Sequence, residues 1–266
     1  MATHTITVSG HDPLEITVDE YGTGRPFLLL HGGAGPQAMG GFAQTLAKRD
    51  NARVLVPTHP GFGGTPRPEW LNNMGGLAQL YRALIEQLDL HDVTVVGNSV
   101  GGWIAAELAI LQSPHISSVI LVGAGGIEVA GQPVVDIFSM TLDQITNLSY
   151  HNPDRFRIDP SRFSDAQRAG MAANRAALRT YGGPMSDATL SARLNAITVP
   201  TLVISGESDR IYTPDYGRAY AAAIPGARFE LLPESGHMPQ LESPEPLLKL
   251  VWDFATAHST RRPTHR

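Results

Sequence analysis

A lone serine stands between glycines in the stretch Gly97-Asn98-Ser99-Val100-Gly101, directly after the β-branched run at 93–96. A serine hydroxyl is a weak nucleophile unless a base takes its proton. A sharp turn from a strand into a helix would expose such a hydroxyl and place the first amide groups of the helix beside it. In so tight a turn, Cβ atoms at positions 97 and 101 would collide with neighbouring backbone. The stretch therefore predicts a nucleophile held on a strained turn.

His237 could act as the base for this serine. It lies in a glycine-containing loop, Ser235-Gly236-His237, that follows a β-like run at 228–232 and precedes the last predicted helix. A loop in that place can reach the ends of neighbouring strands, and an imidazole can accept a proton near neutral pH. The sequence therefore predicts that Ser99 and His237 meet at one edge of a sheet.

Asp209 is the carboxylate that we expect to orient the imidazole. It comes shortly after the apolar run at 202–204, so it too would lie at the end of a strand. A carboxylate there would select the imidazole tautomer that accepts the serine proton, and it would stabilise the imidazolium that forms. Glu207 and Glu128 are the alternative acids. The order serine, aspartate, histidine along the chain favours Asp209.

Short apolar runs alternate with helical patterns along most of the chain. Two runs near the N-terminus, at 5–8 and 14–18, alternate apolar and polar residues and predict a β-hairpin. Helical spacing of apolar residues follows over 77–88, and a last helix is expected from Pro244 with Ser243 as its N-cap. Five further runs are continuously apolar, as in strands that helices cover on both faces: 27–30, 54–56, 93–96, 119–122 and 201–204. This pattern predicts an α/β fold with a mostly parallel central sheet, an antiparallel N-terminal hairpin and flanking helices.

The segment 127–196 breaks this alternation. It lacks a buried strand pattern, but it shows helical patterns at 134–148, from Ser164 with Gln167 placed for a capping box, and at 186–194. We interpret the segment as a helical lid, or cap, over the carboxyl ends of the strands, where open α/β sheets bind ligands. Residues 1–126 and 197–260 would then form the core, and residues 261–266 a flexible tail.

Composition narrows the classes of partner. The 266 residues include 20 Lys and Arg against 25 Asp and Glu, a net charge of −5, and the basic residues are scattered. This argues against nucleic acid or an anionic membrane as a partner. Cysteine is absent, which excludes a thiolate nucleophile and disulfides. The N-terminus lacks a signal-peptide pattern, and no apolar segment has the length that spans a bilayer. We expect a cytoplasmic protein that acts on a small molecule without a metal or an organic cofactor.

Five motifs resemble the α/β-hydrolase-fold family in type and in order. FLLLHGGAG at 27–35 resembles the loop after the third strand of that family, and HPGFGGT at 59–65 resembles the glycine-rich turn after the fourth. The family often has an acidic residue where this chain has His59, and we expect His59 and His31 to be structural. The other three motifs are the nucleophile elbow GNSVGG at 97–102, the acid turn GESDRI at 206–211 and the histidine loop SGHMP at 235–239. The resemblance covers nearly the whole chain.

The resemblance implies a role for each matching residue. Ser99 would be the nucleophile of a serine hydrolase, and Asp209 and His237 would complete its catalytic triad. The amide groups of Val100 and Gly33 would form an oxyanion hole. We expect four further residues to contact the substrate: Ala34, Asn98, Phe138 and Met238.

A serine at position 99 favours acyl chemistry, because dehalogenases and epoxide hydrolases of this fold carry an aspartate there. We expect a carboxylic ester hydrolase that works through an acyl-enzyme. The alternative is a C–C bond hydrolase that acts on vinylogous diketones from aromatic-ring fission. The motifs GNS at 97–99, GAGG at 123–126 and HGGAGP at 31–36 resemble this group, the meta-cleavage product hydrolases. Those enzymes commonly carry a tryptophan after the catalytic histidine, where this chain has Met238. A lactonase, a cofactor-free perhydrolase and a non-catalytic ligand receptor of the same fold are further alternatives.

Overall fold

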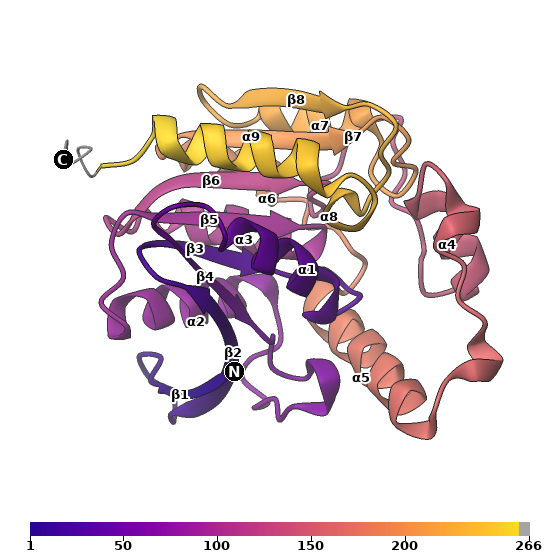
Figure 1. Cartoon of the computed structure of the whole chain (residues 1–266), viewed down its shortest axis with the longest axis horizontal. Helices are drawn as coiled ribbons and strands as arrows, with labels where there is room; N and C mark the ends of the chain where they lie inside the picture. Colours follow the sequence, from indigo (N-terminus) through magenta and orange to yellow (C-terminus); the bar gives the residue numbers. More distant parts are fainter. Residues whose placement is uncertain (261–266) are drawn as a thin grey trace.

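An eight-stranded sheet forms the centre of the computed structural model, which describes residues 1–260 (Figure 1). The strand order is β1-β2-β4-β3-β5-β6-β7-β8, and β2 pairs antiparallel with both β1 and β4. The other pairs of neighbouring strands within these residues are parallel. The strands are β1 (Ala2–Ile6), β2 (Leu14–Gly22), β3 (Arg25–Leu30), β4 (Ala52–Pro57), β5 (Val93–Asn98), β6 (Ile116–Val122), β7 (Thr201–Gly206) and β8 (Arg228–Leu232). The predicted fold class is confirmed; the expected tail at 261–266 lies outside the described residues.

Buried side chains alternate between the two faces of the parallel strands. In β3, Leu28 and Leu30 belong to one hydrophobic core, whereas Phe27 and Leu29 belong to the other. Helices cover both faces, which explains why these strands are apolar at every position. The first core is covered by α2 (Met74–Gln87), α3 (Val100–Ile110) and α7 (Pro214–Ala222), and the second by α1 (Gln37–Leu46) and α9 (Pro244–Ala257).

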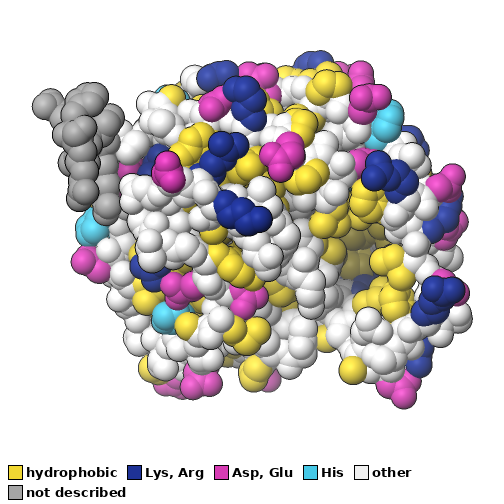
Figure 2. Space-filling view, viewed as in Figure 1, with side chains coloured by type: hydrophobic (Ala, Val, Ile, Leu, Met, Phe, Trp, Pro, Cys, Tyr) yellow, Lys and Arg dark blue, Asp and Glu magenta, His cyan; other side chains and the backbone are white. Residues whose placement is uncertain are grey.

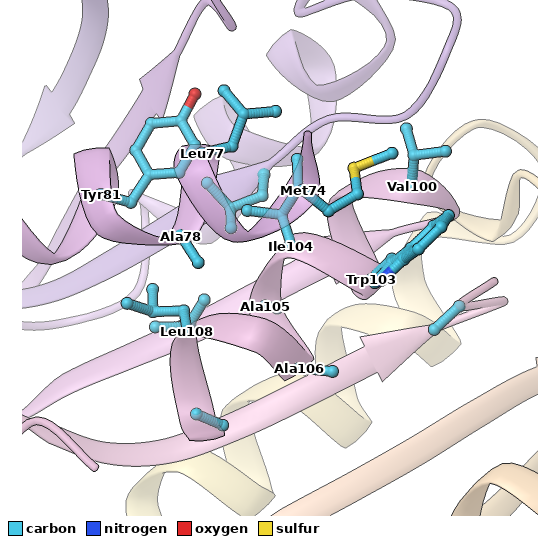
Figure 3. Close-up of a cluster of buried hydrophobic side chains, with 14 of the residues drawn as sticks. Met74, Leu77, Ala78, Tyr81, Val100, Trp103, Ile104, Ala105, Ala106 and Leu108 are labelled. Carbon is cyan, nitrogen blue, oxygen red and sulfur yellow. The ribbon is translucent and has the colours of Figure 1, made fainter. Parts of the chain in front are cut away.

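Helix α3, which begins directly after Ser99, lies deep in the first core. Every residue from Val100 to Ala109 is buried. Figure 3 shows why: side chains of α3, such as Val100 and Trp103, lie close to Met74 and Leu77 of α2. Close packing of this kind resists displacement of either helix. The position of the chain at Ser99 is therefore fixed by the core.

The segment between β6 and β7 supplies most of the remaining helices. Figure 1 shows its two longest helices, α4 (Leu142–Ser149) and α5 (Asp165–Gly182), beyond one end of the sheet rather than on its faces. The capping box predicted for Ser164 and Gln167 is present at the start of α5. The shorter helices of the segment are η2 (Pro153–Arg155), η3 (Pro160–Arg162), α6 (Leu190–Arg193) and η4 (Leu194–Ala196). We refer to residues 127–196 as the inserted segment.

Three local predictions were wrong or too long. The helix expected at 134–148 begins only at Leu142; before it, the Asp136 carboxylate accepts the amide of Phe138, a local bond that competes with helix formation. The helix expected at 186–194 covers only the α6 turn and η4, because the amide of Asp187 is bonded to the carbonyl of Gly126. At the start of α9, the Ser243 hydroxyl does not cap the helix but bonds to the Ser235 hydroxyl at 2.6 Å.

Two short helices complete the part of the chain that the structure describes. Helix η1 (Phe62–Gly64) lies in the glycine-rich turn after β4. Helix α8 (Pro239–Glu242) follows the histidine loop and leads directly into α9. Helix η1 lies within the HPGFGGT motif, and α8 begins at Pro239, the last residue of SGHMP. The turns after β4 and β8 are short and ordered by local backbone bonds.

Candidate active site

Ser99 stands at the sharp turn between β5 and α3. Its φ of 58° is in the left-handed region that non-glycine residues rarely adopt. The turn is possible because its glycines make close backbone contacts: a Cβ at Gly97 would lie 2.1 Å from the Gly101 carbonyl oxygen, and one at Gly101 would lie 2.1 Å from that of Leu30. The Ser99 amide is bonded to the carbonyl of Val122 in β6 at 2.9 Å. The hydroxyl is therefore held at the carboxyl end of the central strands.

Asp209 and His237 form a buried pair at the same end of the sheet. Asp209 Oδ2 lies 2.8 Å from His237 Nδ1, and both residues are buried. The other oxygen, Oδ1, accepts the amide groups of Ile211 at 2.8 Å and Tyr212 at 3.0 Å. Because an ionised carboxylate can only accept, Nδ1 carries the proton, and Nε2 is left to accept one.

The two alternative acids are bonded elsewhere. Glu128 accepts the hydroxyl of Ser186 at 3.1 Å, and Glu207 accepts the amide of Glu234 at 3.2 Å. Of the three carboxylates that the sequence offered, Asp209 is the one beside the histidine.

Ser99 and His237 both line a cavity of about 820 Å³. Figure 2, drawn from the same side as Figure 1, shows a hollow with largely hydrophobic walls between the sheet and the inserted segment. The Ser99 hydroxyl makes no hydrogen bond within residues 1–260, so it is available to a ligand. Much of the wall comes from apolar side chains of the inserted segment, such as Ile137, Phe138, Leu142, Ile145, Phe156 and Phe163.

Two amide groups near Ser99 are available as donors. Val100 and Gly33 line the cavity, and within the described residues neither amide donates a hydrogen bond. The loop that carries Gly33 is close to the serine, since a Cβ at the preceding Gly32 would lie 3.1 Å from Ser99 Cβ. The amide of Val100 also opens helix α3, whose N-terminal dipole favours negative charge. Such donors suit an anion that forms on a carbonyl oxygen.

The cavity wall carries little positive charge. Among its lining residues within 1–260, Arg175 is the only Lys or Arg. Its guanidinium donates to the carbonyl of Phe138 and lies 5.6 Å from the centre of the Phe138 ring. Arg179 lies over the same ring at 4.4 Å. These contacts hold Phe138 in the cavity wall, and they direct the Arg175 guanidinium toward Phe138.

Tyr212 places a phenol ring beside the histidine, with 5.7 Å between the ring centres. Burial, and in addition the nearby Asp209 charge, raise the pKa of Tyr212, so its hydroxyl stays neutral.

Three of the four residues expected to contact a substrate line the cavity: Ala34, Phe138 and Met238. Asn98 is the exception, because it points away from the cavity as the described residues form it. Its Nδ2 donates to the carbonyls of Val122 at 3.2 Å and His237 at 3.0 Å, and its Oδ1 accepts from Gln240 Nε2 at 3.0 Å. Asn98 therefore connects backbone segments of the protein. This corrects the prediction that its side chain contacts the substrate.

His31 and His59 form a buried network under the loop that carries Gly33. The two rings stack with 3.6 Å between their centres. His31 Nε2 accepts the amide of His59 at 3.1 Å, and His59 Nε2 bonds to the carbonyl of His31 at 2.9 Å. His59 Nδ1 is bonded to the hydroxyl of Tyr81. Burial lowers the pKa of His59 to about 4 and that of His31 well below its usual value. Both rings are therefore neutral braces, as expected.

The inserted segment also holds the histidine loop, which the sequence did not reveal. The amide of His237 donates to the carbonyl of Ser149, at the end of α4, at 2.6 Å. The Glu242 carboxylate accepts three amides, those of Gly236 at 2.7 Å, His151 at 3.1 Å and Asn152 at 2.9 Å. The bonds made by Ser149, His151 and Asn152 join positions about ninety residues apart, and neither helical periodicity nor motif spacing signals such pairs.

Within residues 1–260, His, Cys, Asp and Glu side chains form no group of three or more that could hold a metal ion. The same part of the chain contains no helix with the length and apolar character needed to cross a membrane.

Comparison with known proteins places the chain among hydrolases. The sequence model described as the alpha/beta hydrolase family matches residues 27–250. The chain is 27% identical over 271 residues to a 2-hydroxy-6-oxononadienedioate/2-hydroxy-6-oxononatrienedioate hydrolase of Cupriavidus pinatubonensis, with 92% of each protein covered. It is 28% identical over 279 residues to a 2-hydroxy-6-oxo-6-phenylhexa-2,4-dienoate hydrolase of Burkholderia cepacia, with 94% of each covered. A thermophilic esterase from Thermogutta terrifontis has the same fold, with a TM-score of 0.77 at 24% identity over 98% of this chain and 100% of that one.

Proposed function

Because the chain belongs to the alpha/beta hydrolase family, we propose that it is a serine hydrolase that cleaves carboxylic esters of small, largely apolar molecules. One observation carries the proposal: the Asp209–His237 pair and the free Ser99 hydroxyl adjoin the same apolar cavity. A neutral imidazole with its proton on Nδ1 is the form that can act as a base.

In the first half of the reaction, Ser99 Oγ attacks the ester carbonyl carbon and its proton passes to His237 Nε2. A turn about the Cα–Cβ bond of Ser99 is the movement we expect to complete that contact when substrate binds. The carbonyl oxygen becomes negatively charged and accepts hydrogen bonds from the amides of Val100 and Gly33. The C–O bond to the alcohol then breaks, and the alcohol leaves with the proton from Nε2.

In the second half, water replaces the alcohol. His237 Nε2 takes one proton from the water, whose oxygen bonds to the acyl carbon. The same two amides hold the oxyanion, and the bond from that carbon to Ser99 Oγ breaks as the serine regains its proton. The products are the free acid and the original enzyme. Asp209 stabilises the imidazolium in both halves.

The polarity of the cavity supports esters without a charged acyl group. Its single lining arginine within residues 1–260 is bonded to a backbone carbonyl, and most other lining side chains are apolar. Apolar parts of a substrate gain about 25 cal/mol per Å² on leaving water for such a wall. We propose that the inserted segment acts as the lid of this site, because it supplies much of that wall.

A second candidate is C–C bond hydrolysis of a ring-fission product. The observation that favours it is that two relatives named for such reactions align with 92% and 94% of this chain. Their named substrates are carboxylates, which would require a cation at the site. Arg175 is the side chain that could meet this need, although its guanidinium is bonded to Phe138.

Two measurements test the leading proposal. A fluorophosphonate probe should label the folded protein at Ser99, and Ser99→Ala should lower kcat for p-nitrophenyl butyrate by about four orders of magnitude. The exposed Ser9 in the β1–β2 turn provides the control, because Ser9→Ala should keep full activity. Unchanged hydrolysis by Ser99→Ala would contradict the proposal.

A comparison of two substrates tests whether the protein cleaves ester bonds or C–C bonds. We expect kcat/KM for p-nitrophenyl butyrate to exceed that for 2-hydroxy-6-oxo-6-phenylhexa-2,4-dienoate by at least about tenfold, because the second substrate brings a carboxylate into an apolar cavity. The reverse order would favour the second candidate.

A further inference from the structure

Two buried amide side chains connect the turn at Ser99 with the loop at His237. Asn98, which precedes the serine, is 2% exposed, and Gln240 in α8 is 3% exposed. Asn98 Nδ2 lies 3.0 Å from the His237 carbonyl oxygen, and Gln240 Nε2 lies 3.0 Å from Asn98 Oδ1. The residue beside the nucleophile is thus bonded to the backbone of the base.

Only one orientation of the two amides satisfies these contacts. The carbonyls of Val122 and His237 can only accept, so the Asn98 group that faces both of them must be its NH₂. Asn98 Oδ1 then faces Gln240, which must present its own NH₂. The same Gln240 nitrogen lies 3.7 Å from Met238 Sδ, so both of its protons are directed at acceptors. Turning either amide over would bring two acceptors into contact.

Gln240 makes this contact at a cost to folding. Its Oε1 is buried and has no hydrogen-bond partner within the described residues. A buried acceptor without a partner destabilises the folded state, and an apolar side chain of the same length would avoid that cost. Packing alone therefore does not account for a glutamine at this position.

We propose that Gln240 is a positioning residue that, through Asn98, fixes His237 relative to Ser99. The inference rests on the proposed function, since it assigns His237 the role of the base. Gln240 holds the Asn98 amide plane so that its NH₂ stays directed at the His237 carbonyl. Displacement of a reacting group by about 1 Å can cost about a hundredfold in rate. Gln240 itself does not line the cavity, so its removal should affect kcat rather than KM.

The first test is Gln240→Met, which keeps the length of the side chain and removes its donor. We expect kcat for p-nitrophenyl butyrate to fall about tenfold, the effect of one lost hydrogen bond in the reacting state, with KM unchanged. The melting temperature should stay near that of the wild type, because the unpaired Oε1 is removed together with the bond to Asn98. Gln112→Met is the matched control: Gln112 donates to the carbonyl of Ala196 at the surface, just beyond the end of α3 that is opposite to Ser99.

The second test is Gln240→Glu, which has the same shape but a pH-dependent donor. A protonated carboxyl can donate to Asn98 Oδ1, whereas a carboxylate repels it. We expect kcat of this variant, divided by that of the wild type, to fall as the pH rises from about 5 to about 8, while the ratio for Gln240→Met stays constant. A purely structural role would not produce this difference in pH profile.

Two outcomes would overturn the inference. One is a wild-type kcat for Gln240→Met; the other is a constant ratio across the pH range for Gln240→Glu. Ser99→Ala separates this result from failure of the proposed function. If Ser99→Ala is inactive and the Gln240 variants are fully active, only the positioning role fails; if Ser99→Ala is fully active, both fail.

Discussion

At the scale of single residues, the chemistry depends on which nitrogen of His237 carries the proton. Asp209 decides this, because its Oδ1 is already occupied by the amides of Ile211 and Tyr212 and only Oδ2 faces the ring. These bonds prevent the carboxylate from rotating. It can accept a hydrogen bond from Nδ1 but cannot donate one. The aspartate acts here through orientation as much as through charge.

Asp209→Asn should reverse the tautomer of the histidine. The asparagine oxygen would keep the two amide bonds, which leaves its NH₂ directed at Nδ1. The ring would then carry its proton on Nε2 and could no longer accept one from Ser99. We expect kcat to fall about 10⁴-fold, with little change in melting temperature. The measurement is hydrolysis of p-nitrophenyl butyrate together with thermal unfolding, and a loss below about tenfold would contradict the role of Asp209.

At this scale, sequence reasoning relies on residue type and chain order. Ser99, Asp209 and His237 could be selected in that way, and the structure brings Asp209 and His237 into contact. The sequence analysis also predicted that Asn98 contacts the substrate. Its side chain points the other way, toward Gln240 and the His237 carbonyl. Side-chain direction at a strained turn depends on backbone angles and distant partners, which a single sequence does not give.

At the scale of elements, the turn after β6 supports the aspartate–histidine pair. Gly123 follows the end of β6 with a φ of 51°, and a Cβ there would lie 3.1 Å from both Asp209 Oδ2 and His237 Nδ1. That separation is tighter than ordinary van der Waals contact. A side chain at Gly123 would therefore require the pair to shift by a few tenths of an ångström.

Gly123→Ala should displace the pair, and a second glycine separates this effect from backbone strain. Gly10, in the β1–β2 turn, also has a positive φ, and a Cβ there meets nothing within 4 Å. Both variants should lose about 1 kcal/mol of stability from the left-handed backbone. Only Gly123→Ala should also lose activity, by about tenfold or more, because it moves groups in the reacting geometry. Equal activities of the two variants in ester hydrolysis would contradict this account.

The elements themselves were predicted best where periodicity is strong. The apolar runs at 93–96 and 201–204 became β5 and β7, and the capping box at Ser164 opens α5. The stretch 134–141 was wrongly assigned to a helix, because its apolar residues recur at helical spacing while Asp136 forms a local bond to the amide of Phe138. The apolar residues of this stretch contribute to the cavity wall instead of forming one face of a helix.

At the scale of the whole molecule, the site is assembled from segments that only the sheet brings together. The strand order places β5 between β3 and β6, so that Ser99 lies near both the Gly33 loop and the turn at Gly123. The motifs predicted an α/β fold, but the bonds from Ser149 to His237 and from Glu242 to His151 and Asn152 had no counterpart in the sequence. They are single contacts between distant positions, which periodicity cannot report.

The buried histidines make the stability of the whole fold depend on pH. The pKa of His59 is about 4 in the folded chain, against 6.5 for an ordinary histidine. Between these values the unfolded chain binds a proton that the folded chain does not. The free energy of unfolding is therefore highest above about pH 6.5, and it falls as the pH approaches about 4. For His59 alone, the free energy of unfolding decreases by about 3 kcal/mol between about pH 6.5 and about pH 4. His31 acts in the same direction, since burial lowers its pKa as well.

Urea unfolding at several pH values measures this loss. The slope of unfolding free energy against pH should be smaller in His59→Gln than in the wild type between about pH 6.5 and about pH 5, because glutamine does not titrate. This window lies above the ordinary range of carboxyl groups, so the difference between the two proteins reports the histidine. If the two slopes are equal, His59 is not the neutral brace that its bonds to His31 and Tyr81 indicate. The loop that carries Gly33 rests on that brace, so acid should weaken the fold and the candidate oxyanion site together.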